Sequence, residues 1–321
     1  MQMIEAVPNI CEAQDKENLT RILGDVKAVL GNVQLLHVDS NADANRTVLT
    51  LAGQPEQVVH VCFMLYQACA RYIDMRFHSG AHPRLGAVDV CPLIPLKNIT
   101  LEETVSFADS LARQVAQELQ IPVYLYEANA SAPSRKNLAF IRKGGYEMLP
   151  TKLELLPPDY GPRRFTQNVA RSGASVIGTR NFLISFNISL NTQNVNIAKA
   201  IAAKLREKND GLPGVKAIGW YMEGYGCAQV SFNLVDFHKS NLQNVFEACK
   251  KEAATQGLEI TGSELIGLVP QEALLLAGKF YAPSTTKESA LISTAVKNLL
   301  LDKIHPFVAG ERILEKALKS N

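Results

Sequence analysis

The stretch FLISFNISL at residues 182–190 decides the predicted fold, because its apolar residues run or alternate as they do in a β-strand. The elements that follow keep the order helix, strand, strand, helix, strand: a helical pattern over about 194–207, VKAIGWYME (215–223), AQVSFNLVDF (228–237), a helical pattern over about 242–256, and LEITGSELIGLVP (258–270). The order β-α-β-β-α-β is the ferredoxin-like one.

The first half of the chain repeats this rhythm. Its pattern consists of a short apolar opening at 4–7, a helix over about 15–30, strands at 33–39 and 47–52, and a helix over about 55–72. Pro55 suits the first turn of that last helix, where its missing N–H costs nothing. We therefore predict an α/β (α+β) fold of two ferredoxin-like subdomains, residues 1–179 and 180–321, each with helices on one face of a mixed sheet.

The segment between the halves, residues 151–180, is rich in proline, glycine and arginine and has weak periodicity. It is predicted to be a long surface segment, and segments of that kind are usually functional or linkers. The last 50 or so residues are predicted to be helical on the periodicity of QEALLLAGKF, KESALISTAVKNLLLDKI and ERILEKALK.

Composition limits the classes of protein. Of the 321 residues, 47 % are hydrophobic and 20 % charged, which is typical of a globular protein with a sizeable core. A net charge of +2 gives no reason to expect nucleic acid or an anionic membrane as a partner. The motifs GxSxG, GxxxxGK[ST] and GxGxxG after a strand are all missing from the sequence.

The six cysteines form no CxxC pair, and we expect free thiols in a reducing compartment. The opening MQMIEAVPNICEAQDKE has acidic residues and a proline where a signal peptide needs an apolar run. No apolar run approaches the roughly 18 residues of a membrane span. We therefore expect a cytoplasmic protein.

The segment FHSGAHPRLGAVDVCP at 77–92 is the most informative in the chain. It places His78, His82 and Arg84 in a loop with glycines and prolines, ahead of an apolar strand. Histidine titrates close to neutral pH and is suited to proton transfer there. A His-x3-His pair binds zinc when it shares a helix face, but Gly80 and Pro83 disfavour a helix, and we predict no metal. A purely structural loop is the alternative.

A second polar cluster, HVDSNADANRT at 37–47, joins two predicted strands. Asp39 ends an apolar run, where a strand edge can present a carboxylate to a cleft. Asn45 and Arg46 offer hydrogen-bond donors that suit a carboxylate ligand. The alternative is a connection rich in Asx turns.

Two further segments carry candidate residues. Asn9, in VPNICEA at 7–13, is either a ligand contact or part of the entry to the first helix. The segment that begins at Gly161 gathers arginines and glycines, which suits an anionic, elongated ligand, and a solvated linker is the alternative. Its residues are Gly161, Pro162, Arg163, Arg164, Phe165, Arg171, Gly173, Gly178 and Arg180.

Together these segments resemble the formiminotransferase family, specifically the formiminotransferase domain of formiminotransferase-cyclodeaminase without the cyclodeaminase domain. The run RYIDMRFHSGAHPRLGAVDVCPLIP (71–95) is similar to the family pattern RLIDMxxHxGxHPRMGAxDVxPFxP. The resemblance extends in order through VPN, HVDS…NRTVLTLAG (37–53), IPVYLYE (121–127), LPPDYGP (156–162), NFLISFNISL (181–190), IGWYME (218–223), AQVSFNLVDF (228–237) and GSELIGLVPQEAL (262–274).

The resemblance implies transfer of a formimino group from N-formimino-L-glutamate to tetrahydrofolate, a step of histidine breakdown. Tetrahydrofolate would be a co-substrate, with no metal and no nucleic acid or membrane partner. The resemblance also implies a homodimer whose subdomain sheets face each other with helices outside and the ligand between them. The catalytic histidine falls on His82, and the folate-binding segment on about Gly161 to Gly173, with another contact near Gly214.

The remaining roles are hypotheses from residue type and matching position. Asp39 would orient His82 or pair with the cationic formimino group. Arg46 and Arg84 would hold substrate carboxylates, and Arg163 and Arg164 would meet the glutamate tail of the folate. Contacts with substrate are further expected from Asn9, Asn45, His78, Gly86, Pro162, Phe165 and Gly178.

The chain departs from the family opening VPNFSEG, because Cys11 and Ala13 stand where serine and glycine are expected. It also has Ala170-Arg171-Ser172-Gly173 in a stretch where an aromatic residue is expected before the glycine. Two alternatives stay open on this basis: formyl transfer from N-formylglutamate, and a folate-binding protein without catalysis.

Overall fold

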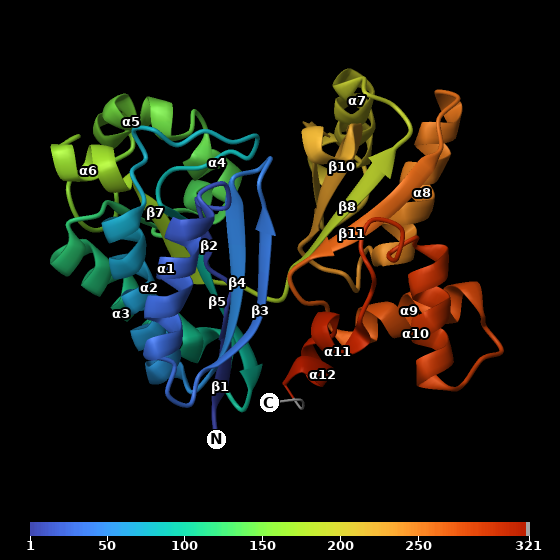
Figure 1. Cartoon of the computed structure of the whole chain (residues 1–321), viewed down its shortest axis with the longest axis horizontal. Coiled ribbons are helices and arrows are strands. Elements are labelled where there is room, and N and C mark those ends of the chain that lie inside the picture. Colours follow the sequence, from blue (N-terminus) through green and yellow to red (C-terminus); the bar gives the residue numbers. More distant parts are fainter. Residues whose placement is uncertain (319–321) are drawn as a thin grey trace. The chain divides into compact units, whose positions relative to one another are not determined.

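The computed structural model describes residues 1–318, and the last residue of the predicted helical run ERILEKALK lies outside that range. The chain divides into two compact units, Met1–Asn181 and Phe182–Asn321. The first unit contains a sheet of seven strands and the second a sheet of four (Figure 1). Each unit is described by itself.

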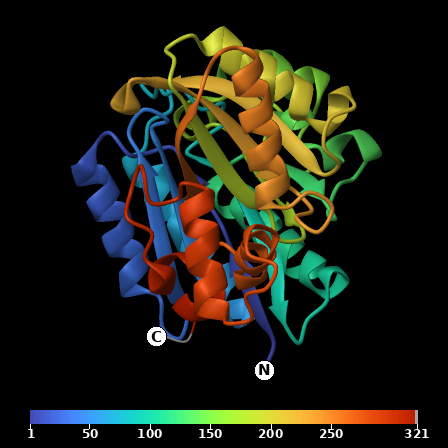
Figure 2. The same cartoon turned by 90° about the vertical axis from the view of Figure 1, so that its right-hand side faces the viewer.

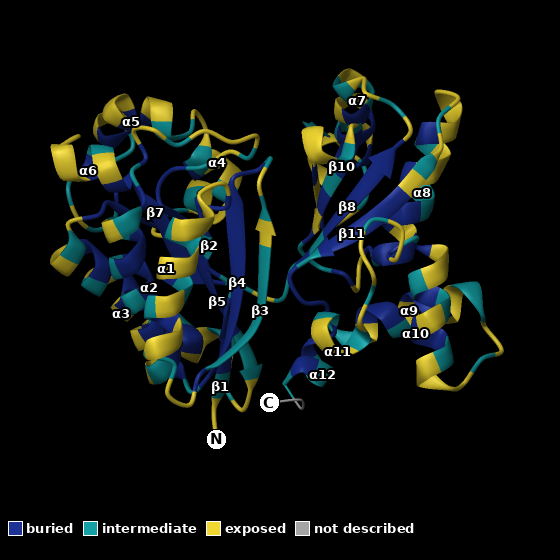
Figure 3. Ribbon diagram, in the orientation of Figure 1, coloured by how far each residue is buried: buried dark blue, intermediate teal, exposed yellow. Residues whose placement is uncertain are grey.

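The first unit begins with a β-α-β-β-α-β frame, as predicted. An interrupted strand, β1 with β2, pairs antiparallel with both β4 and β5, and β3 pairs with the outer edge of β4. The strand β3 is therefore an edge strand, and it is partly exposed where β4 is buried throughout (Figure 3). The elements of this frame are β1 (Met3–Ala6), β2 (Asn9–Ile10), α1 (Lys16–Ala28), β3 (Gln34–Asn41), β4 (Arg46–Gly53), α2 (Pro55–Tyr72) and β5 (Val88–Lys97).

An extension follows this frame and enlarges the sheet beyond β5. Strand β7 pairs parallel with β5, and β6 pairs parallel with β7, so the first sheet is mixed as predicted. A capping box between Thr100 and Glu103 begins the long helix of this extension. Its elements are α3 (Leu101–Leu119), β6 (Val123–Glu127), η1 (Pro133–Lys136), α4 (Leu138–Arg142), η2 (Tyr146–Met148), α5 (Leu149–Leu155), α6 (Gln167–Ser172) and β7 (Ser175–Thr179).

The prediction of a long surface segment over 151–180 is wrong. This part of the chain includes α6 and the strand β7, which is buried along its whole length between β5 and β6. The sequence of this strand, SVIGT, shows no alternation of polar and apolar residues because both of its faces are buried, which is why the periodicity of the sequence did not reveal it.

Helices cover both faces of the first sheet, not one face as predicted. Side chains of α1, α2 and α3 form the larger core with β1, β4 and β5. A second, smaller core lies around Val90, Tyr124 and Val176 of the strands, packed against Ile141 of α4 and residues of α5 and α6. The second core matters for function because it fixes the short helix α4 over the start of β5.

The second unit has the predicted β-α-β-β-α-β frame, with strand order β11-β8-β10-β9. Every pairing in it is antiparallel, so the prediction of a mixed sheet is wrong for this half. The reason is topological, since β8 has the two oppositely directed strands β10 and β11 as neighbours. The helix α8 lies along the face of this sheet that Figure 2 turns to the viewer. The frame consists of β8 (Ile184–Leu190), α7 (Val195–Leu205), η3 (Glu207–Asn209), β9 (Val215–Met222), η4 (Glu223–Tyr225), β10 (Cys227–Leu234), α8 (Leu242–Thr255) and β11 (Ile260–Ile266).

The rest of the second unit is helical, as predicted for the end of the chain. Gly278 and Leu291 bring the two longer helices close together, because a Cβ at Gly278 would lie 2.2 Å from the Leu291 carbonyl oxygen. The helices are α9 (Gln271–Tyr281), α10 (Glu288–Asn298), α11 (Ala309–Arg312) and α12 (Leu314–Ala317).

Candidate active site

The loop between α2 and β5 carries His78 and His82 and is fixed to the turn between β3 and β4. The Ala81 N–H donates to the Asp43 carbonyl at 3.0 Å, and the Asn45 side-chain amide donates to the Ser79 carbonyl at 2.9 Å. Gly80 permits this approach, since a Cβ there would lie 2.4 Å from the Ala44 carbonyl oxygen. The two polar segments that the sequence analysis singled out therefore form one structure.

A buried ion cluster holds the other end of this loop. The Asp89 side chain is fully buried, and its Oδ2 accepts from Arg46 Nη1 and Arg142 Nη2, both at 2.7 Å. Its Oδ1 accepts from the Leu85 backbone N–H at 2.9 Å. The Arg46 Nε also donates to Asn9 Oδ1 at 3.0 Å. The carboxylate thus ties β4 and α4 to the end of the loop, and Arg46 extends the cluster to β2.

The charges of this cluster do not cancel. Burial by itself would raise the pKa of Asp89, but the guanidinium groups of Arg142 and Arg46 outweigh it and lower that pKa to about 2. The carboxylate is ionised at neutral pH. The largely buried guanidinium groups of Arg46 and Arg142 share its single negative charge. The cluster therefore has an excess of one positive charge beside the loop.

His82 is half-buried, and this positive excess acts on it. Burial, followed by the charges of Arg46 and Arg142, holds the pKa of His82 well below its ordinary value, and Asp89 acts in the opposite direction. The His82 Nδ1 lies 2.7 Å from the Pro83 carbonyl oxygen. A carbonyl only accepts hydrogen bonds, so Nδ1 carries the proton and the neutral ring has its lone pair on Nε2. His82 is thus arranged as a neutral proton acceptor.

His78 is arranged differently. Its Nε2 lies 3.1 Å from the Asn45 carbonyl, and its Nδ1 accepts from Arg84 Nε at 3.2 Å, so both ring nitrogens are engaged. Arg84 also donates to the His78 carbonyl and forms an ion pair with Glu147 at 2.7 Å. Burial, with the nearby arginine charges, lowers the pKa of His78. These contacts suit a residue that braces the loop.

Gly86 and Gly173 join the loop to the segment that begins at Gly161. Their backbones form an isolated antiparallel bridge, and a Cβ on Gly173 would lie 2.3 Å from the Gly86 Cα. A Cβ on Gly86 would in turn lie 2.5 Å from the Ala174 carbonyl oxygen. These two predicted site glycines therefore have a packing role, whatever their contact with a ligand.

Phe165 approaches the site through Tyr146. The two ring centroids are 6.3 Å apart, and the Arg84 guanidinium lies 6.0 Å from the Tyr146 ring. Arg163 and Arg164, which precede Phe165, are exposed. The first unit thus brings a basic, partly aromatic surface segment towards Arg84.

The other predicted residues lie elsewhere. Gly161 follows Tyr160 at the start of the exposed segment, next to Pro162, and Gly178 lies within β7. Gly214 belongs to the second unit, in the turn before β9. Asp39 lies on the edge strand β3, 3.7 Å from His37 Nε2, and its proposed action on His82 stays a prediction.

The sequence analysis did not include Asp89 and Arg142 among the site residues. Asp89 could have been singled out from the sequence, because it is the only charged residue in the otherwise apolar run VDVCPLIP. Arg142 could not, since it comes from a five-residue helix and lies 53 positions along the chain from its partner. Only the folded structure brings the two together.

The two departures at the opening turn fall on buried positions. Cys11 belongs to the larger core, and burial, with the charge of Asp89, raises the pKa of its thiol to about 12. The Ala13 backbone N–H donates to Asn45 Oδ1 at 2.9 Å. Both positions thus pack behind the loop, and the Cys11 thiol has no nucleophilic character at neutral pH.

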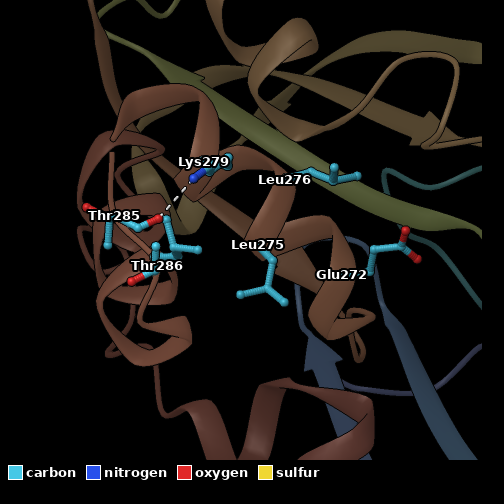
Figure 4. Close-up of a pocket in the computed structure, with 7 residues that line it drawn as sticks. Glu272, Leu275, Leu276, Lys279, Thr285 and Thr286 are labelled. Atoms are coloured by element: carbon cyan, nitrogen blue, oxygen red, sulfur yellow. Dashed lines mark hydrogen bonds between the residues drawn. The ribbon is translucent and has the colours of Figure 1, made fainter. Parts of the chain in front are cut away.

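A hollow in the second unit is lined by none of the residues predicted for the site. It measures about 420 Å³, between α9 and the start of α10, and the Lys279 ammonium donates to the Thr285 carbonyl across it at 3.1 Å (Figure 4). The residues that line it are Glu272, Leu275, Leu276, Lys279, Thr285, Thr286 and Leu291.

Residues 1–318 contain neither a candidate membrane-spanning helix nor a candidate metal-binding cluster. Among their helices, none combines the length and apolar character needed to cross a membrane. Within the same residues, no three His, Cys, Asp or Glu side chains gather closely enough to hold a metal ion.

Comparisons with known proteins match nearly the whole chain. The model of the formiminotransferase domain, N-terminal subdomain, matches residues 3–180, and that of the formiminotransferase domain matches residues 185–319. A formimidoyltransferase-cyclodeaminase of Mus musculus is 43 % identical over 98 % of this chain and 59 % of its own length. A glutamate formimidoyltransferase of Streptococcus pyogenes serotype M1 is 40 % identical over 87 % of this chain and 93 % of its own, and one of Thermoplasma acidophilum is 39 % identical over 88 % and 92 %. The chain thus spans about 59 % of the length of the formimidoyltransferase-cyclodeaminases that it matches.

Proposed function

The chain belongs to the formiminotransferase family, and from this premise we propose that it is a glutamate formimidoyltransferase. It transfers the formimino group of N-formimino-L-glutamate to N5 of tetrahydrofolate, and the products are 5-formiminotetrahydrofolate and L-glutamate. The observation that carries the proposal is the state of His82, a neutral imidazole beside a cluster with excess positive charge.

The reaction needs one group that first accepts and then donates a proton. The folate N5 attacks the amidine carbon, a C–N bond forms, and N5 loses its proton to His82 Nε2. The tetrahedral intermediate then collapses, the bond to the glutamate nitrogen breaks, and the proton passes from His82 to that nitrogen. A histidine that is neutral in the resting enzyme performs both steps in sequence.

The arrangement also supports roles for the neighbouring residues. Arg46 and Arg84 are cations whose protein partners, Asp89 and Glu147, fix their positions, and we assign them the holding of substrate carboxylates. The exposed Arg163 and Arg164 suit the anionic tail of the folate, with Phe165 alongside. Asp39 is assigned the pairing with the cationic formimino group.

The cellular setting is proposed on the family resemblance. The enzyme acts in the cytoplasm as a homodimer, in the breakdown of histidine. Its small-molecule partners are tetrahydrofolate and the glutamate derivative.

The test is a spectroscopic transfer assay with tetrahydrofolate and formiminoglutamate, on the full chain and on His82→Ala. We expect the variant to lose about 100- to 10,000-fold in kcat, the usual contribution of a general acid–base group. His60→Ala, an exposed histidine on α2, is the matched control and should keep full activity. The folate dissociation constant of His82→Ala should stay measurable.

Three outcomes contradict the proposal. Undiminished turnover in His82→Ala removes the catalytic role. Turnover of the full chain with formylglutamate alone assigns it a formyl donor, and folate binding without turnover on either donor makes it a binding protein.

A further inference from the structure

Arg142 is largely buried, yet the described residues do not satisfy all of its donors. Its Nη2 donates to Asp89, but its Nε is buried and has no hydrogen-bond partner within residues 1–318. Arg135 makes the useful comparison, because its Nη1 donates to Asp159 and its Nη2 to the Pro157 carbonyl, both at 2.7 Å. Both arginines are largely buried, but only Arg142 keeps a buried donor without an acceptor.

A buried donor without an acceptor is costly to a folded protein and is rare. The cost is larger on a guanidinium that already shares its carboxylate with a second cation, as Arg142 shares Asp89 with Arg46. A second anion at Arg142 would supply the missing acceptor and balance the excess charge. Arg142 therefore combines an unsatisfied donor with an incompletely balanced charge, and an anionic ligand would satisfy both.

The position of Arg142 ties such an anion to the reacting group. The same Asp89 oxygen contacts Arg142 and Arg46, and the charges of both arginines act on His82. The loop that carries His82 ends at the same carboxylate, because the Leu85 N–H donates to Asp89 Oδ1 at 2.9 Å. An anion bound to Arg142 therefore lies beside the end of this loop. Arginine binds carboxylates through two parallel N–H donors, which fixes orientation as well as position.

Resting on the proposed function, we propose that Arg142 binds the α-carboxylate of the glutamate donor. This carboxylate is attached to the same carbon as the nitrogen that leaves, so a contact to it brings that nitrogen to His82. Arg142 is then the residue that positions the leaving group, and the site selects amino-acid donors with a free α-carboxylate.

The experiment is a calorimetric titration of the full chain with L-glutamate and with isoglutamine, in which the α-carboxylate is replaced by an amide. Arg142→Gln should weaken L-glutamate binding by about tenfold or more, the usual effect of a charge-assisted hydrogen bond. Isoglutamine should bind the unaltered chain more weakly by a similar factor. Arg142→Gln should then weaken isoglutamine little further, because the two changes remove one contact.

Matched variants separate binding from folding. Arg135→Gln removes an ion pair of the same unit and should leave both titrations unchanged. Arg142→Lys keeps a cation beside Asp89 and carries the test if Arg142→Gln does not fold. A lysine has no planar fork, so we expect an intermediate loss of L-glutamate binding in that variant.

The outcomes also distinguish this proposal from the proposed function. Equal weakening of L-glutamate and isoglutamine by Arg142→Gln overturns it, as does unchanged L-glutamate binding in that variant or a failure of the unaltered chain to bind L-glutamate. None of these readouts needs folate or turnover. An absence of transfer with formiminoglutamate, by contrast, defeats the proposed function alone.

Discussion

The two units share one β-α-β-β-α-β frame but bury different polar groups on it. In the first unit the buried cluster is ionic, with Asp89 between two arginines. In the second unit the buried carboxylate of Glu264 is held by side-chain amides, from Asn187 at 3.2 Å and Gln229 at 3.3 Å. The same frame therefore supports a charged cluster in one unit and an amide cluster in the other.

The source of the difference is the extension that follows β5 in the first unit. It adds α4, whose last residue is Arg142, and the second core holds that helix in place. The second unit continues instead into α9 and α10, which pack against each other through Gly278. The chemistry of the molecule thus depends on what is added to the frame, as is common for folds that serve many functions.

The largest expected effect is on stability, and it differs between the ionic cluster of the first unit and the amide cluster of the second. Asp89→Asn leaves Arg46 and Arg142 without their shared carboxylate, and we expect the free energy of unfolding to fall by about 3–5 kcal/mol. Glu264→Gln keeps a hydrogen-bonding group among its amides and should cost about 1 kcal/mol. Urea unfolding measures both, and losses of equal size would remove the distinction between the clusters.

The next effect concerns the backbone contact that joins the loop to the second core. Gly86→Ala places a Cβ against the Ala174 carbonyl, and forced overpacking of this kind costs about 1–3 kcal/mol. Gly24→Ala is the control, since it lies inside α1 with open space around it and should stabilise the chain by about 0.5–1 kcal/mol. Thermal unfolding of the two variants checks the opposite signs. A destabilisation by Gly24→Ala equal to that by Gly86→Ala would contradict this account.

The smallest effect is a displacement of the pH profile. The pKa of His82 is lowered in part by Arg142, so removal of that charge in Arg142→Gln raises it. The acidic limb of kcat/KM reports protonation of the base in the free enzyme, and it should therefore move to higher pH in this variant. Arg135→Gln should leave the limb in place. A limb that stays in place or moves to lower pH in Arg142→Gln would contradict this action of Arg142 on His82.

Particular residues show how far the sequence alone could lead. The alternating strands of 184–190 and 227–234 predicted the frame of the second unit, because each has one polar and one apolar face. The strand β7 has no such alternation and was missed inside a segment rich in proline and glycine. Alternation of polar and apolar residues indicates a strand with one buried face. It therefore does not reveal a short strand that is buried on both faces.

The candidate site, like the fold, could be predicted only in part from the sequence. Asn9, Asn45, Arg46, His78 and Arg84 were predicted from their segments, and hydrogen bonds bring them together around the loop that carries His82. The pairing of Asp89 with Arg142 depends on the docking of α4 and could not be predicted from local pattern. The ionic neighbours of His82 are therefore a tertiary property, although His82 itself is a sequence motif.

The central claim is that burial, together with the arginine cluster, keeps His82 neutral, with its proton on Nδ1. A ring-resolved NMR titration of the histidines in the full chain, with His82→Ala to assign the resonance, measures both properties at once. We predict a His82 pKa well below the ordinary value for a histidine, and a neutral ring protonated on Nδ1. A His82 pKa at or above that ordinary value, or a neutral ring protonated on Nε2, would contradict the account.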